Sequence, residues 1–435
     1  MKSRLLLLCG LAAAVIGLSA PAPVAGAEGP SLDDARAAIA EGRLDEAAQI
    51  LAAVDPAEAD VNDLDFLSGM LAVARGDYDA AQASFRAILR RDPHLTRVRL
   101  ELARAYFLAH DDRAAAHQFE RAAAEADLPP AVRRKIDAYL REIRDRRRWS
   151  LSLSVGFMPD SNVNAATASK TVEIYGIPFH LDPTARKKSG IGLTARIGAG
   201  YDLPVAPRHR LSAAMVLDEL NYDGGDHDLR TISGSLGPRF RIGMWTELGL
   251  AAVANRRWYG GEGYSHALGG RVRIAARATP RLHLGGAFEA TRMRYDRSTF
   301  LDGAQIRLDA SVTYALDPTS AVGADFIHMK ENTRLDAFDN ARSILVLRYG
   351  RDFRGGWRLD LTGHGGLADY EAVFPAFGKE RKDRSLGVEL AVANRNIDIF
   401  GFMPVVAVGH ERRDSNIPLY DYRRERLSFW LTRNF

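Results

Sequence analysis

Histidine, cysteine and serine would reveal acid–base, metal or nucleophilic chemistry through their spacing, but none of them forms such a pattern in this sequence. The 11 histidines are dispersed and contain no HExxH pair, the spacing that brings two zinc ligands to one face of a helix. Neither a GxSxG nucleophile elbow nor a GxxxxGK[ST] phosphate loop occurs. The sequence therefore predicts that the protein is not an enzyme and binds neither a cofactor nor a metal.

One short polar cluster, "PDSNVN", has residue types that suggest a specific local role. Besides one valine, the cluster consists of Pro159, Asp160, Ser161, Asn162 and Asn164. The proline fixes its own backbone angle, and the four polar side chains can bond to nearby backbone groups. A two-residue hairpin would need nothing more, but this cluster begins a link of about 30 residues, 158–188. Two interpretations stay open: the cluster orders the start of this link, or it contacts a partner directly.

The first 27 residues have the pattern of a secretory signal peptide. Lys2 and Arg4 precede an apolar run, and small residues stand at Ala25 and Ala27 before the expected cleavage point. The only cysteine, Cys9, lies inside this segment, so residues 28–435 can form neither a disulfide framework nor a thiolate metal site. Removing the two basic residues leaves 57 Lys+Arg against 55 Asp+Glu, a net charge of +2. This near-neutral balance gives no indication of nucleic-acid binding.

Residues 28–148 are predicted to form tetratricopeptide-like helical repeats. At a shift of 34 residues, "GRL" at 42 aligns with "GDY" at 76, and Leu51 aligns with Phe85, a period typical of helix pairs that stack into a short solenoid. Three repeats and a capping helix from Ala131 to about 147 are expected. The expected concave face contains Phe66, Met70, Arg97, Arg104 and Phe107. It is either a surface for a peptide or partner protein, or scaffold.

Residues 149–435 change to period-two alternation, which places successive side chains on opposite faces of a strand. In "GIGLTARIGAGY" the residues from Ile191 to Tyr201 alternate between apolar and small or polar types. About 14 such segments, with short and longer turns in alternation and an aromatic last residue, predict an antiparallel transmembrane β-barrel. The segments begin near residues 149, 190, 209, 228, 244, 264, 281, 303, 319, 341, 356, 384, 403 and 423.

Two groups of residues in the predicted barrel have expected positions. The terminal strand carries Leu427, Phe429, Leu431 and Phe435. Mixed charges that line a wet lumen are expected at Arg196, Arg271, Arg273, Arg307, Asp309, Arg358 and Asp360. Lateral opening between the first and last strands is a further possibility that the sequence leaves open.

The turns predict the orientation of the barrel in the membrane. Short turns at "TP" 279–280, "DPT" 317–319 and "RGG" 354–356 are expected on the periplasmic side, with the helical repeats. The longer links 158–188, 370–383 and 414–421 are then expected outside the cell. Whether the first of these links plugs the barrel stays open.

The repeats, the barrel, "MPDSNVN" after the first strand and the aromatic-terminated last strand together resemble the surface lipoprotein assembly modifier (Slam) family of Gram-negative outer membranes. The resemblance implies a barrel that moves surface lipoproteins, or secreted haem-binding and other host-interaction proteins, across the outer membrane. It also implies a periplasmic N-terminal domain that engages the client protein or its chaperones. The outer-membrane barrel assembly machinery and outer-membrane lipid are further expected partners. The alternatives are a passive porin-like pore and a polysaccharide-export barrel.

Overall fold

The structure, a computed structural model, describes residues 31–57, 59–146 and 148–434. The predicted signal peptide, residues 1–27, and the terminal Phe435 lie outside these residues. The chain divides into two compact units, one up to Ala115 and one from Ala116 to the end. The described residues contain seven α-helices: α1 Leu32–Ala40, α2 Leu44–Ala53, α3 Val61–Arg75, α4 Tyr78–Arg91, α5 Thr96–Leu108, α6 Asp112–Ala123 and α7 Pro130–Arg146. No helix in these described ranges is long and apolar enough to cross a membrane.

The 34-residue period of the sequence reappears in the backbone of the helical turns. Gly42, Gly76 and His110 follow each other at this spacing, and all three have positive φ angles, of 78°, 78° and 62°. Glycine adopts this left-handed conformation without steric cost. The third repeat keeps the conformation although its residue is a histidine. The prediction of tetratricopeptide-like repeats is therefore confirmed.

A close approach between α3 and α4 depends on one glycine. A Cβ atom at Gly69 would lie 2.7 Å from the ring of Phe85, which is fully buried. The ring of Phe66 also packs against Phe85, with 5.8 Å between ring centroids. The absent side chain thus creates the space that the aromatic ring fills.

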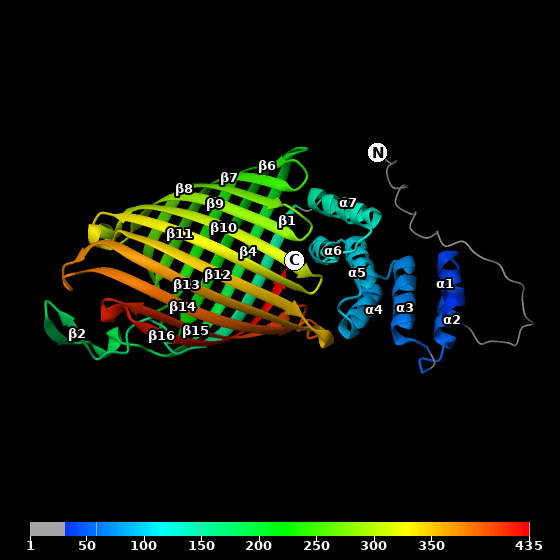
Figure 1. Ribbon diagram of the computed structural model, residues 1–435, viewed down its shortest axis with the longest axis horizontal. Helices are drawn as coiled ribbons and strands as arrows, with labels where there is room; N and C mark the ends of the chain where they lie inside the picture. Colours follow the sequence, from blue (N-terminus) through cyan, green and yellow to red (C-terminus); the bar gives the residue numbers. More distant parts are fainter. Residues whose placement is uncertain (1–30, 58, 147, 435) are drawn as a thin grey trace, which may run out of the picture. The chain divides into compact units, whose positions relative to one another are not determined.

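Fourteen of the described strands form a closed antiparallel barrel (Figure 1). They are β1 Trp149–Asp160, β4 Gly190–Ala206, β5 His209–Tyr222, β6 Leu229–Ile242, β7 Thr246–Tyr259, β8 Glu262–Arg277, β9 Leu282–Tyr295, β10 Gly303–Asp317, β11 Ser320–Thr333, β12 Asn340–Asp352, β13 Trp357–Phe374, β14 Lys379–Asn394, β15 Met403–Ser415 and β16 Tyr422–Asn434. Each strand pairs with its neighbours in sequence, and β16 pairs with β1 to close the barrel. The predicted architecture is confirmed.

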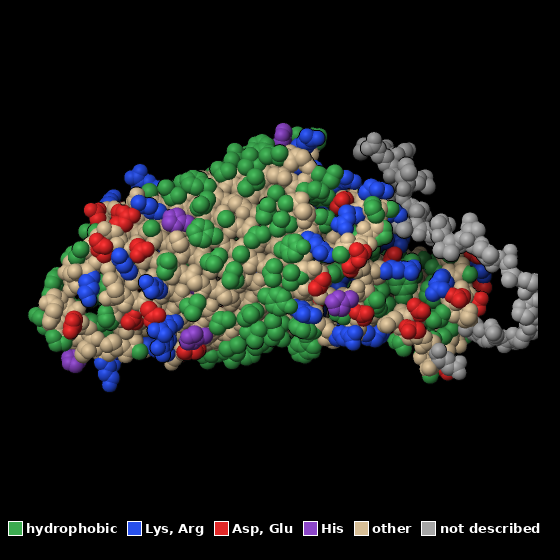
Figure 2. All heavy atoms as spheres, in the orientation of Figure 1, with side chains coloured by type: hydrophobic (Ala, Val, Ile, Leu, Met, Phe, Trp, Pro, Cys, Tyr) green, Lys and Arg blue, Asp and Glu red, His purple; other side chains and the backbone are tan. Residues whose placement is uncertain are grey.

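The alternating side chains give the barrel an apolar outer wall. Large apolar residues at alternating positions remain exposed, among them Leu193 at 62%, Leu268 at 63% and Leu386 at 69%. Figure 2 shows hydrophobic side chains along the middle of the barrel wall, with charged side chains gathered towards its two ends. An exposed apolar band of this kind is typical of a surface that faces lipid.

The two ends of the barrel differ in their connections. The helix end, where α7 leads into β1, has turns of two to four residues at 207–208, 243–245, 278–281, 318–319 and 353–356, and one longer turn at 395–402. The opposite, loop end carries the 161–189 link, which contains the hairpin of β2 Thr171–Ile174 and β3 Ile177–His180. Figure 1 shows β2 beyond the ends of the barrel strands.

One expected loop is mostly strand. The sequence predicts a link over 370–383, but β13 continues to Phe374, β14 begins at Lys379, and only 375–378 form the turn. The strand positions Arg381 and Asp383 face inward as a buried ion pair. Charged residues on both faces hide the alternation here, because a strand that extends beyond the lipid needs no apolar face.

Candidate functional site

The junction of β1 and β16, here called the seam, has the fewest residue pairs of the strand junctions among the described residues of the barrel. Seven residue pairs join the two strands: Ser152–Phe157 with their partners on β16, and then Asp160 with Arg426. The other neighbouring barrel strands share 11 to 15 pairs among the described residues. The gap in the seam falls at Met158 and Pro159, and proline has no N–H to donate. The seam is therefore weakly bonded through its backbone.

Side chains of the "PDSNVN" cluster reinforce the seam at the loop end. The fully buried carboxylate of Asp160 accepts hydrogen bonds from Nε of Arg424 on β16, at 2.8 and 3.0 Å. The hydroxyl of Tyr222 on β5 donates to the same carboxylate at 3.0 Å. The backbone N–H of Asn162 donates to it at 2.8 Å. One carboxylate thus joins three barrel strands that are far apart in sequence.

The next two residues of the cluster bind the last strand directly. The backbone N–H of Ser161 donates to the carbonyl of Glu425 at 2.9 Å, and its hydroxyl donates to the Glu425 carboxylate at 2.6 Å. Nδ2 of the fully buried Asn162 donates to the carbonyls of Ala166 at 2.9 Å and Arg423 at 3.1 Å. Asp160, Ser161 and Asn162 with their partners on β16 are called the seam clasp below.

The last residue of the cluster orders the long link. Nδ2 of Asn164 donates to the carbonyl of Arg186 at 2.8 Å, and its Oδ1 accepts from the N–H of Lys188 at 3.1 Å. The two ends of the link are thereby held together. Farther along, the N–H of Tyr175 donates to the carbonyl of Ala376, in the turn between β13 and β14, at 2.9 Å.

The charged residues expected in the lumen lie on the face opposite the lipid-exposed side chains and mostly form ion pairs within the wall. Arg196 pairs with Asp218 at 2.6 Å, and Nε of Arg271 donates to Glu289 at 2.6 Å. Two further pairs join Arg307 to Asp309 at 2.7 Å and Nε of Arg358 to Asp360 at 2.7 Å. Arg273 lines, with Arg271, a cavity of about 380 Å³. The inner wall is therefore polar, with charges that largely compensate each other.

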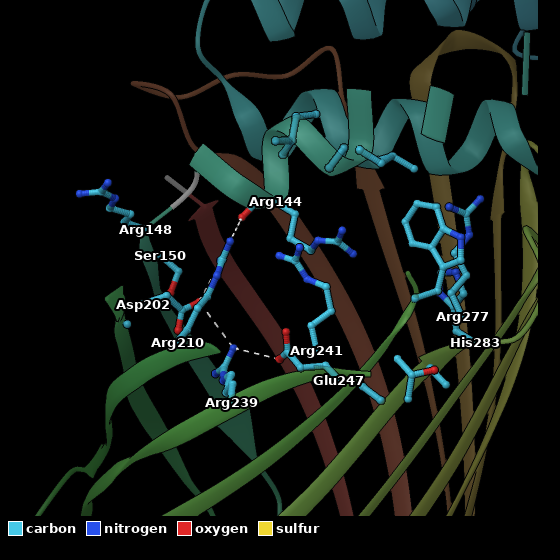
Figure 3. A pocket seen from close by; sticks show the side chains of 18 of the residues that line it. Arg144, Arg148, Ser150, Asp202, Arg210, Arg239, Arg241, Glu247, Arg277 and His283 are labelled. Atoms are coloured by element: carbon cyan, nitrogen blue, oxygen red, sulfur yellow. Dashed lines mark hydrogen bonds and ion pairs between the residues drawn. The ribbon is translucent and has the colours of Figure 1, made fainter. Parts of the chain in front are cut away.

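At the helix end, residues 116–146 lie against the rim of the barrel and are called the mouth clamp below. Nη1 of Arg144 on α7 donates to the carbonyl of Met244, between β6 and β7, at 2.7 Å. Arg241 pairs with Asp145 on α7 at 2.7 Å, and Arg210 donates to the carbonyl of Arg144. Figure 3 shows Arg144 above Arg210, Arg239 and Arg241 of the barrel wall.

The mouth clamp also contacts the rim between β8 and β13. Nε of Arg121 donates to the carbonyl of Pro318 at 2.6 Å, and its guanidinium pairs with Asp352. Nε of Arg281 donates to the carbonyl of Ala124 at 2.7 Å. Three turns of the helix end and the adjoining ends of β5, β6 and β12 are thus involved, so the segment is fixed across much of the rim.

A cavity of about 590 Å³ lies between the mouth clamp and the rim (Figure 3). Its charged lining residues are Arg144, Arg148, Arg210, Arg239, Arg241 and Arg277, with Glu120, Asp202 and Glu247. Enclosure by the surrounding walls raises the pKa of Glu120 on α6, although the nearby Arg277 opposes this shift. This site was not predicted from the sequence, where its signal is the recurrence of arginine beside the short turns.

The remaining predicted site residues are distributed over both units. Of the five expected concave-face residues on α3 and α5, Arg97 is exposed and the other four are half-buried, and the guanidinium of Arg97 lies 5.0 Å from the ring centre of Phe66. Arg104 pairs with Glu101 at 3.3 Å, and Met70 and Phe107 lie on the same two helices. In β16, Leu427 is exposed, Phe429 stacks on Phe157 at 4.8 Å, and Leu431 pairs with Val155.

Two family profiles match this chain and together cover both of its parts. The profile described as "Surface lipoprotein assembly modifier" matches residues 149–435, which is the whole barrel. The profile of the N-terminal repeats of the same family matches residues 35–119. The chain belongs to the surface lipoprotein assembly modifier family. This Slam membership confirms the resemblance inferred from the sequence and places the protein in the outer membrane of a Gram-negative bacterium.

Individual relatives of this Slam protein are distant but match over most of their length. "Surface lipoprotein assembly modifier 1" of Neisseria meningitidis is 25% identical over 85% of this chain and 75% of its own. "Surface lipoprotein assembly modifier 2" of Haemophilus influenzae is 27% identical over 81% and 73%. "Hemophilin secretion modulator" of Acinetobacter baumannii is 22% identical over 85% and 78%. Among solved structures, the outer-membrane channel DcaP of Acinetobacter baumannii is similar with a TM-score of 0.41, at 10% identity, over 66% of this chain and 96% of its own.

Proposed function

We propose that this Slam protein moves surface lipoproteins across the outer membrane, with residues 28–148 in the periplasm and 149–435 in the membrane. The observation that carries the proposal is the joint match of both family profiles to one chain that combines helical repeats with a closed barrel. A passive pore needs the barrel but has no use for the repeats.

The connections support an orientation with the helix end in the periplasm. Bacterial outer-membrane barrels have short turns on the periplasmic side and longer loops outside the cell. Five of the six turns at the helix end contain two to four residues, whereas the ordered 161–189 link stands at the loop end. The repeats precede β1 in the chain and would meet client proteins before the barrel does.

The repeats and the rim are suited to successive steps of client binding. The half-buried Phe66, Met70 and Phe107 offer apolar contacts, and Arg97 and Arg104 offer charged ones, on the α3 and α5 side of the repeats. The arginine-rich cavity at the mouth clamp then offers guanidinium groups to acidic side chains or to peptide carbonyls. Periplasmic chaperones and the barrel assembly machinery are further proposed partners, the former at the repeats and the latter during insertion of the barrel.

The test is deletion of the gene and complementation, with the surface of intact cells as the readout. Protease treatment of intact cells followed by mass spectrometry should show one or more lipoproteins that lose surface exposure on deletion and regain it on complementation. Uptake of small solutes should not change. If every surface protein stays exposed while solute uptake falls, the protein is a passive pore and the proposal is wrong.

A secreted, non-lipidated client is the second candidate, because the Acinetobacter relative is named for secretion of hemophilin. The same experiment separates the two classes when the culture medium is analysed as well. A protein that disappears from the medium, with all surface lipoproteins unchanged, would indicate the second class.

A further inference from the structure

A lipidated client sets a requirement that the closed barrel does not meet. Its acyl chains must end in the lipid of the membrane, but the inner wall carries ion pairs such as Arg271 with Glu289 and Arg196 with Asp218. Acyl chains are more stable in lipid than beside water and charge. A route from the lumen to the lipid therefore has to pass through the wall, which means between two neighbouring strands.

The seam is the place where this opening breaks the fewest interactions. Its seven residue pairs compare with 11 to 15 at the other junctions of the described strands. Pro238 interrupts the β6–β7 pairing as Pro159 interrupts the seam, but 12 pairs remain there. The seam is also the junction whose two strands are not consecutive in the barrel sequence. No turn or link therefore restrains them.

The two ends of the seam differ in how they are held. At the helix end, the described part of the seam begins with Ser152 opposite Asn434. At the loop end, the seam clasp holds β1 to β16 through the buried Asp160–Arg424 pair and through Ser161. A buried ion pair and side-chain hydrogen bonds thus reinforce the loop end of the seam, so separation of the strands meets the most resistance there.

We propose that the barrel opens laterally at the seam, from the helix end towards the loop end, and that the seam clasp acts as the hinge that keeps β1 and β16 in register. This inference rests on the proposed function, because only a lipidated client requires the opening. Asp160, Ser161 and Asn162 are then positioning residues that allow the strands to close again in the same register. The opened seam would expose the row from Ser152 to Phe157 to the lipid.

A disulfide across the seam tests the opening. Residues 28–435 contain no cysteine, so an introduced pair has no competing thiol in the mature protein. Ser154 and Thr432 are direct partners across the seam, and the Cα separations of paired strands fall within the range that a disulfide spans. The first cross-linked variant, called the seam lock, carries Ser154→Cys and Thr432→Cys. If the barrel of this variant does not fold, a second variant carries Val155→Cys and Leu431→Cys.

The matched control places the same cross-link at a junction that should stay closed. Ala391 and Ala407 are direct partners on β14 and β15, and the control is Ala391→Cys with Ala407→Cys. The probe is the lipoprotein that loses surface exposure when the gene is deleted. Heat-modifiable migration on gels verifies that each variant is folded in the outer membrane, and non-reducing gels verify the cross-link.

With the seam oxidised, surface exposure of the probe should fall at least tenfold and recover after reduction with dithiothreitol, whereas the control variant should export it under both conditions. Normal export through an oxidised seam overturns the inference. Equal loss in the oxidised control also overturns it, because the effect would then reflect general stiffening of the barrel. If the cysteine-free protein itself exports no lipoprotein, the proposed function fails instead, so the two failures are distinguishable.

Discussion

Replacing Asp160 with asparagine should destabilise the barrel far more than the same change at an exposed ion pair. The Asp160 side chain is completely buried and its partner Arg424 is only 15% exposed. Removing one member of a buried pair leaves the other charge uncompensated and typically costs about 3–5 kcal/mol. The remaining exposure of Arg424 places the expected loss near the lower end, about 3 kcal/mol in the free energy of unfolding.

The matched control is Asp218→Asn. Asp218 and Arg196 also form a short ion pair, at 2.6 Å, but their side chains are 43% and 61% exposed. Exposed pairs contribute about 0–1 kcal/mol, so the two variants should differ by about 2–3 kcal/mol. That difference corresponds to roughly 30- to 150-fold in the unfolding equilibrium.

The measurement is urea-induced unfolding of the full chain in lipid vesicles, followed by tryptophan fluorescence. Asp160→Asn should unfold at a clearly lower urea concentration than both the wild type and Asp218→Asn. In the double variant with Arg424→Gln, the loss should be smaller than the sum of the two single losses, because no buried charge is left unpaired. If Asp160→Asn unfolds like Asp218→Asn, the reasoning from burial is refuted.

Three further changes test other parts of the molecule. A triple variant in which Asp160, Ser161 and Asn162 are all alanine should export less client protein, although its barrel is folded in the outer membrane. Unchanged export would mean that the cluster is a turn that export does not require. Gly69→Ala should cost about 1–3 kcal/mol through the clash with Phe85, seen as an earlier thermal loss of helical circular dichroism than in the wild type. Trypsin added to intact cells should cleave near Lys379 and spare residues 31–146, and cleavage within the repeats would reverse the proposed orientation.

The barrel could be predicted closely from the sequence because lipid imposes a simple pattern. Every strand that faces lipid on one side and water on the other must alternate, and starts such as Trp149, Gly190 and Gly303 coincide with the predicted positions. The start of β14 was missed by five residues, at Lys379 rather than 384. There the strand rises beyond the lipid, and the constraint that produces the alternation no longer applies.

The contacts of the candidate site could not be predicted, because they join segments that are remote in sequence. The turn-forming residues of "PDSNVN" were recognised, but Asp160 and its partner Arg424 are separated by 264 positions. From the sequence alone, many arginines could form the ion pair with Asp160. Arg424 is its partner because closure of the barrel brings the first and last strands together. The mouth clamp has the same origin, since Arg121 reaches Asp352 only after the strands have closed into a ring.

Proline and aspartate at adjacent positions have opposite effects on the seam, and their order along β1 explains the proposed hinge. Pro159 removes a backbone donor and so weakens the ladder, while Asp160, one residue nearer the loop end, adds a buried ion pair and the hydrogen bond from Tyr222. If the order were reversed, the strong contact would lie inside the seam and would have to break at each opening. With the observed order, the six pairs from Ser152 to Phe157 can separate while the clasp remains intact.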